Sequence, residues 1–149
     1  MIENMGLINI MDKIDGSKIS YGIQEVDNTY LPLKRVEKYW GYMETLFDND
    51  LYTVKRIFMK KGSQSSLEYH VKKRETYYIE SGILKVGVRT GRAKNSSFIM
   101  KKGELFDIKP GLMHMRMALE DTVIIEHSTK DDDSDSHIVE DGKTYRHVE

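Results

Sequence analysis

Between Leu51 and His127 the chain alternates between apolar and polar positions with the period of two that is typical of β-strands. In the first segment, 52–60, Val54 and Phe58 fall on one face, which predicts a half-buried strand. Turn signals then recur roughly every 8–12 residues, and no amphipathic helix interrupts them, so the region predicts an all-β sandwich or barrel. The further strands are expected at 66–71, 76–79, 83–88, 97–100, 105–108, 113–118 and 122–127.

The segments that flank this region have a different texture. Residues 1–30 show no clear period, so we expect residues 1–33 to form an N-terminal extension and residues 34–149 to form the domain. Residues 31–50 suit a short helical turn or an irregular segment, with Trp40 as a core anchor. The acidic run 130–135 predicts a solvated loop, because charge runs are usually solvated. A calcium site is the alternative, but the run lacks the glycine of an EF-hand loop.

Composition narrows the classes of function. The 149 residues carry a net charge of -1, which argues against a nucleic-acid or membrane partner that is held by bulk charge. There are no cysteines, so disulfides, thiolate zinc sites and thiol nucleophiles are excluded. The N-terminus lacks the basic start of a secretory signal, and we expect a cytoplasmic protein.

Four side chains could bind a metal ion. Glu68 and His70 are two positions apart on a predicted strand and therefore share a face. Glu75 begins the next strand, and His114 begins a later one. If the shared face is buried, one divalent ion (Zn, Mn, Fe, Co or Ni) would compensate these groups. If the strand lies at an edge, the same pair faces solvent, and alternation alone leaves both possibilities open.

The spacing of these residues resembles the two motifs of the cupin superfamily. The first motif is matched by Gly62-x5-Glu68-x-His70-x4-Glu75-x6-Gly82, with Glu68 in place of the usual histidine. The second is matched by Gly103-x6-Pro110-Gly111-x2-His114, with the proline moved next to the glycine. This resemblance implies a cupin double-stranded β-helix, or jelly-roll barrel. It also implies a single divalent metal held by Glu68, His70, Glu75 and His114.

A closer resemblance covers roughly residues 34–149. Lys38-Tyr39-Trp40-Gly41, Leu67-Glu68-Tyr69-His70 and the acidic ending at Val139-Glu140-Asp141 are similar to the cupin domain of bacterial type II mannose-6-phosphate isomerase/mannose-1-phosphate guanylyltransferase. It implies a metal-dependent isomerase or epimerase for a sugar phosphate or nucleotide sugar, in carbohydrate or polysaccharide precursor metabolism.

Roles for individual residues follow from this second resemblance. Glu68 replaces a glutamine of that family and would serve as a metal ligand or as the catalytic base, and Arg146 is the second catalytic candidate. Cations and a tyrosine on the strands would contact the substrate, and arginine suits phosphate. The substrate-binding candidates are Arg56, Tyr78, Lys85 and Arg116.

Two other functions remain open at this point. One is a carbohydrate-binding cupin without catalysis, because the family histidine is absent at Lys72. The other is a metal-dependent dioxygenase, because a fold does not fix a function. We also expect a homodimer, by analogy with the family, with the N-terminal extension as its contributor.

Overall fold

β-strands dominate the part of the chain that the structure, a computed structural model, describes: residues 32, 34–92 and 94–144. The expected N-terminal extension lies outside these residues, apart from position 32, and so does Arg146. The elements are β1 (Lys34–Lys38), β2 (Gly41–Asp48), β3 (Tyr52–Met59), β4 (Leu67–His70), β5 (Glu75–Ser81), β6 (Ile83–Thr90), β7 (Lys94–Lys101), β8 (Leu105–Ile108), β9 (Met113–Ala118), β10 (Thr122–Thr129), the 3-10 turn η1 (Asp133–Asp135) and β11 (Ser136–Glu140).

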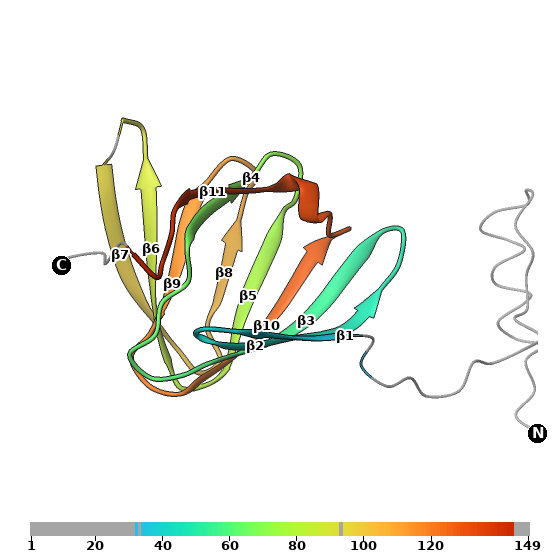
Figure 1. The fold of residues 1–149 in the computed structure, drawn as a ribbon, viewed down its shortest axis with the longest axis horizontal. Helices are drawn as coiled ribbons and strands as arrows, with labels where there is room; N and C mark the ends of the chain where they lie inside the picture. Colours follow the sequence, from blue (N-terminus) through green and yellow to red (C-terminus); the bar gives the residue numbers. More distant parts are fainter. Residues whose placement is uncertain (1–31, 33, 93, 145–149) are drawn as a thin grey trace, which may run out of the picture. The chain divides into compact units, whose positions relative to one another are not determined.

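Two antiparallel sheets make up the domain (Figure 1). One has the order β1-β2-β3-β10-β5-β8 and the other the order β11-β4-β9-β6-β7. Strands that are distant in sequence therefore pair, as β10 does with both β3 and β5. This arrangement confirms the predicted all-β fold of the jelly-roll type. No helix in the described residues is long and apolar enough to cross a membrane.

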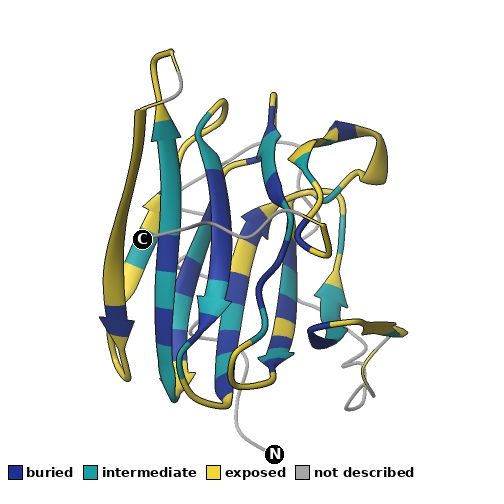
Figure 2. Cartoon of the chain, turned by 60° about the vertical axis from the view of Figure 1, so that its left-hand side comes forward, coloured by how far each residue is buried: buried dark blue, intermediate teal, exposed yellow. Residues whose placement is uncertain are grey.

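Two predictions for individual segments were wrong, and one strand was not predicted. Within the segment 31–50, residues 34–38 and 41–48 form β1 and β2 instead of a helical turn or an irregular segment, and β2 pairs with β3 along nearly its whole length. The acidic run is followed by a further strand, β11, which pairs with β4. On β3 the buried face is the one with Thr53 and Ile57, not the one with Val54 and Phe58. Buried and less buried positions alternate along the strands of the domain (Figure 2). Alternation identified the strand, but it could not say which face looks inward.

The inward face changes from apolar to charged along several strands. On β3 the buried Lys55 lies two positions before the buried Ile57. On β10 the buried Glu126 lies two positions after the buried Ile124. On β9 the inward residues run from Ala118 to His114. The apolar end is filled by Trp40, Ile57, Met59, Tyr77, Ile79, Leu84, Val86, Met100, Ile108, Ala118 and Ile124. Trp40 is therefore a core residue, as predicted, and the other end of the barrel holds polar groups.

Two glycines that frame the first sequence motif give a matched test of the fold. Gly62 and Gly82 both have positive φ, 79° and 85°, where a side chain is strained. A Cβ at Gly62 would meet nothing within 4 Å, whereas a Cβ at Gly82 would lie 2.3 Å from the Asp121 carbonyl oxygen. Gly62→Ala should thus cost about 1–2 kcal/mol of unfolding free energy. Gly82→Ala should cost about 1–3 kcal/mol more, by urea denaturation, because the backbone must shift. Equal losses would contradict the close approach at Gly82.

Candidate metal centre

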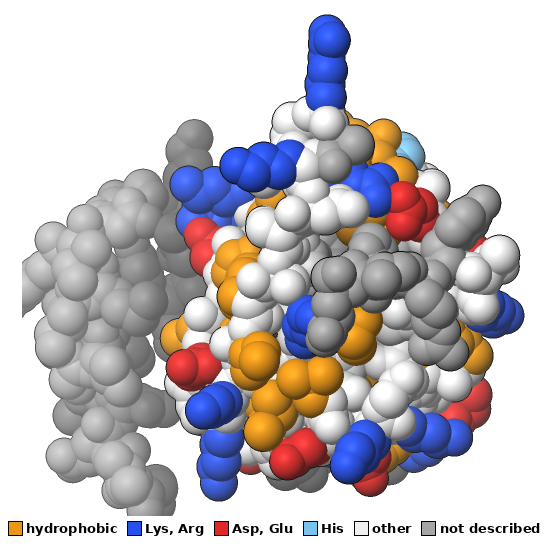
Figure 3. All heavy atoms as spheres, turned by 90° about the vertical axis from the view of Figure 1, so that its left-hand side faces the viewer, with side chains coloured by type: hydrophobic (Ala, Val, Ile, Leu, Met, Phe, Trp, Pro, Cys, Tyr) orange, Lys and Arg blue, Asp and Glu red, His pale blue; other side chains and the backbone are white. Residues whose placement is uncertain are grey.

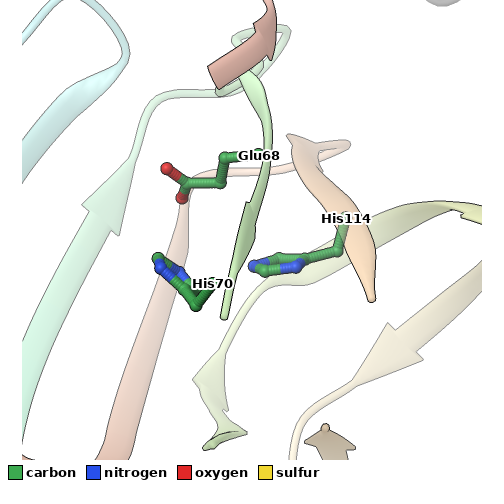
Figure 4. Close-up of side chains that lie close together, drawn as sticks. All are labelled: Glu68, His70 and His114. Atoms are coloured by element: carbon green, nitrogen blue, oxygen red, sulfur yellow. The ribbon is translucent and has the colours of Figure 1, made fainter. Parts of the chain in front are cut away.

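Three of the four predicted metal ligands converge inside the barrel (Figure 4). Glu68 and His70 lie on β4 and His114 lies on β9, and Glu68 is the direct register partner of His114. One ligand atom from each of the three residues lies within 4.8 Å of the other two. Both histidines are buried and Glu68 is partly buried, so the pair Glu68–His70 faces inward rather than toward solvent.

The two histidine rings are held in the orientation that a metal ligand needs. His70 Nδ1 lies 3.0 Å from the Asp135 carbonyl oxygen, and His114 Nδ1 lies 2.9 Å from the Leu112 carbonyl oxygen. A ring nitrogen next to a carbonyl oxygen carries the proton, so the neutral ring presents a lone pair at Nε2. Anchoring of the second nitrogen by a carbonyl is typical of metal-bound histidine. A divalent ion therefore fits these residues.

Glu75 lies next to both histidines and is 2 % exposed. Its Oε1 is 2.8 Å from His114 Nε2 and 3.7 Å from His70 Nε2. A lone pair and a carboxylate oxygen at 2.8 Å repel, so a proton or a metal ion must lie between them. Without metal it is a proton. Burial acts against the charged forms, but the contact raises the pKa of His114 and lowers that of Glu75.

A lysine that the sequence did not single out supports Glu75. Lys73 Nζ lies 2.8 Å from Glu75 Oε2, 3.2 Å from Asp131 Oδ1 and 3.4 Å from Glu126 Oε1. Burial lowers the pKa of an ammonium group, yet these three carboxylates raise the pKa of Lys73 above its usual value. Asp131 also pairs with Lys55. Lys73 therefore stays charged, and it leaves Glu75 Oε1 to face the histidines.

The acidic run is part of the centre and not only a solvated loop, which corrects the prediction for residues 130–135. The buried Asp135 carboxylate accepts backbone N–H bonds from Val71, Lys72 and Lys73 at 2.9–3.0 Å. Its backbone carbonyl anchors His70. Asp135 thus fixes the loop between β4 and β5, which carries Lys73. Period-two alternation could have indicated Lys55 and Glu126, but nothing in the sequence pattern indicated Asp135.

A cavity of about 600 Å³ opens beside the centre, and two of the three converging residues, Glu68 and His70, line it. Its lining includes Glu68, His70, Lys73, Arg116 and Glu126, together with Trp40. A neighbouring cavity of about 670 Å³ shares Lys55 and Asp131 with it but contains none of the three ligands. We therefore place the functional site in the smaller one.

The predicted substrate contacts divide between the inside and the outside of the barrel. Arg116 is buried and lines the cavity. Arg56 lies on the exposed face of β3, where it pairs with Glu44. Tyr78 and Lys85 alternate with the inward residues of β5 and β6, so they project from the other faces of those strands. The structure thus brings Arg116 alone of these four to the centre.

Comparison with known proteins agrees with this fold. The sequence matches the cupin family over residues 21–143. The chain belongs to the cupin family. This confirms the resemblance carried by the two motifs, and cupins commonly hold a divalent metal. No curated protein matches the sequence.

Solved structures with the same fold include cupins of several kinds. The capsular polysaccharide assembling protein CapF from Staphylococcus aureus has a TM-score of 0.63 and 21% identity, over 75% of this chain and 33% of its own. Oxalate decarboxylase from Bacillus subtilis has a TM-score of 0.63 and 20% identity, over 93% and 39%. KdgF from Halomonas sp. has a TM-score of 0.57 and 14% identity, over 68% and 91%.

These similarities cover only part of some of the solved structures, and their sequence identity is low. The chain spans about a third of the length of CapF. At this level of identity the shared feature is the cupin fold, and the closer resemblance to mannose-6-phosphate isomerase is not shown by it.

Metal content provides the direct test of the centre. His70→Ala and His114→Ala should each weaken metal affinity by about 10–100-fold or more, because a ligand is lost. The purified variants should therefore carry less metal per chain. His127→Ala is the matched control, since His127 is exposed on β10 and should leave the metal content unchanged. Plasma mass spectrometry of the purified proteins measures the result. Equal metal content in all four proteins would contradict the site.

Lys73 should be essential to stability even though it lies next to a metal centre. Lys73→Met leaves three carboxylates without their shared cation and should cost about 3–5 kcal/mol of unfolding free energy. Lys72→Met changes the exposed neighbour and should stay within about 0.5 kcal/mol of the natural protein. Urea denaturation of metal-free protein separates the two. A loss below about 1 kcal/mol for Lys73→Met would show that this cation does not stabilise the buried carboxylates.

Proposed function

We propose that this cupin is a metal-dependent isomerase or epimerase, which moves a proton next to a carbonyl group in a small sugar-derived substrate. The observation that supports it most is the inward convergence of Glu68, His70 and His114, with both histidines oriented by backbone carbonyls. We include Glu75 as the fourth ligand, because its Oε1 faces both Nε2 atoms. When bound, a divalent ion would polarise the carbonyl oxygen of the substrate and stabilise negative charge on it.

The reaction also needs a base, and Glu126 is the residue that suits it. Its carboxylate is 4 % exposed, lines the cavity and is not one of the three converging ligands. Glu68, which the sequence suggested as metal ligand or base, lies with His70 and His114 and accepts a hydrogen bond from Ser136. We therefore assign Glu68 to the metal and Glu126 to the removal and return of the substrate proton. Lys73, 3.4 Å from Glu126, keeps this carboxylate in place.

The sugar phosphate implied by the closer sequence resemblance is one form of this proposal. The name of CapF, a capsular polysaccharide assembling protein, is in keeping with a role in polysaccharide precursor metabolism. The phosphate contacts expected from Arg56 and Lys85 find no support, because both lie on outward faces. We therefore propose the reaction type and a sugar-derived substrate, and place its anionic group by the argument in the next section.

The homodimer remains a prediction, and the surface gives it some support. Phe98, Ile99 and Leu105 are large apolar residues that are exposed on the edge strands β7 and β8. Figure 3, which faces the side with β6 and β7, shows apolar side chains grouped among charged ones. Exposed edge strands with apolar side chains favour pairing with another chain.

Proton exchange tests the proposed reaction. The metal-loaded protein in D₂O should remove the NMR signal of the proton next to the carbonyl in at least one member of a panel of sugar phosphates and sugar acids. Glu126→Gln should slow this exchange by about 100-fold or more, because the base is lost, with metal content unchanged. His127→Ala should exchange at the natural rate. Binding without exchange for every member of the panel would overturn the isomerase and favour a carbohydrate-binding cupin.

A further inference from the structure

Two hydrogen-bond donor atoms of Arg116 have no acceptor in the described part of the chain. The residue is 5 % exposed and lines the cavity, yet Nε and Nη1 have no hydrogen-bond partner among the described residues. Buried donors of a charged group are costly when they stay unpaired. An unpaired, buried guanidinium that faces a cavity therefore indicates an anionic ligand there.

The surroundings of Arg116 hold the guanidinium in place without using its donors. Its Cζ lies 5.2 Å from the centre of the Trp40 ring and 5.5 Å from that of the Tyr77 ring. Its Nη2 is 4.0 Å from Glu68 Oε1, which is too long for a hydrogen bond. A guanidinium that is fixed by aromatic rings is well suited to bind a planar, two-oxygen group such as a carboxylate.

Arg116 is also close to the metal centre. Arg116 and His114 are both inward residues of β9, two positions apart, or about 6.8 Å along the strand. Glu68, which contacts Arg116 at 4.0 Å, belongs to the ligand group itself. An anionic group bound at Arg116 would therefore lie close to the atom of the same bound molecule that contacts the metal. In a sugar phosphate that reacts at its carbonyl end, the terminal phosphate lies at the opposite end of the molecule.

We propose that Arg116 binds the carboxylate of the ligand, and that the oxygen on the adjacent carbon reaches the centre at Glu68, His70 and His114. The ligand is then a 2-hydroxy or 2-oxo acid, such as the carboxylate end of a sugar acid. This inference rests on the metal centre of the proposed function, and it names the class of substrate for that site.

Calorimetric titration with three small probes tests the assignment. Lactate and propionate share a carbon skeleton and differ in the 2-hydroxyl, and inorganic phosphate represents the other class of anion. The full chain loaded with Mn²⁺ should bind lactate about tenfold more tightly than propionate, and phosphate more weakly than lactate. Removal of the metal with EDTA should abolish the difference between lactate and propionate.

Variants then show whether Arg116 is responsible. Arg116→Gln should weaken lactate binding by about tenfold or more, because a charged hydrogen-bonding group is lost. Arg56→Gln, on the outward face of β3, should bind lactate as the natural protein does. If Arg116→Gln unfolds, Arg116→Lys keeps the charge, removes the planar fork and should still weaken lactate binding at full metal content.

The outcomes separate this inference from the proposed function. Tighter binding of phosphate than of lactate, or lactate binding that is unchanged in the Arg116 variants, would overturn the carboxylate assignment while the metal centre stands. The protein could instead bind no metal and bind lactate and propionate equally, in a way that depends on Arg116. This result would overturn the proposed function and the contact of the adjacent oxygen with the metal. It would support only the contact between Arg116 and the carboxylate.

Discussion

Charge that is buried at one end of the barrel has to be compensated, and much of the structure follows from this requirement. The inner surface is apolar where Ile57, Ile124 and Ala118 pack. Two positions along the same strands it carries the charged side chains of Lys55, Glu126 and Arg116. Isolated charges are too costly in such a place, so each is met by an opposite charge, a backbone group or a ligand. Lys73 among its three carboxylates shows the first solution. The Asp135 carboxylate, with three N–H donors, shows the second.

The same requirement explains why the histidines and Arg116 indicate function. His70 and His114 have their Nδ1 atoms satisfied by carbonyl oxygens, while their Nε2 atoms face a carboxylate that a proton or a metal must bridge. Arg116 has unpaired donors beside them. Arg116, His70 and Glu68 line one cavity, and Glu68 is the register partner of His114. Lys73 and Asp135 find their partners within the described part of the chain, and they serve as a frame for these few groups.

The sequence predicted the strand-rich barrel and the convergence of Glu68, His70 and His114 better than it predicted strand faces and long-range partners. Glycine positions and the spacing of Glu68, His70 and His114 are local features, and local features are visible in a sequence. Val54 and Phe58 were placed on the wrong side because alternation divides a strand into two faces without saying which one is buried. Lys73 and Asp135 were missed because their importance depends on long-range contacts with β10 and with the β4–β5 loop. Arg56 and Lys85 look the same as Arg116 in sequence, and only their strand faces separate them.

The contact between Asp135 and His70 spans 65 positions of the chain, and it bears on how the protein matures. During synthesis the segment with Glu68, His70 and Glu75 emerges first, but nothing then fixes the His70 ring or the loop that carries Lys73. The orientation of the ligands is completed only after Asp135 has been made and η1 has closed against β4. The candidate metal centre is therefore complete only when segments 65 positions apart in the chain have come together.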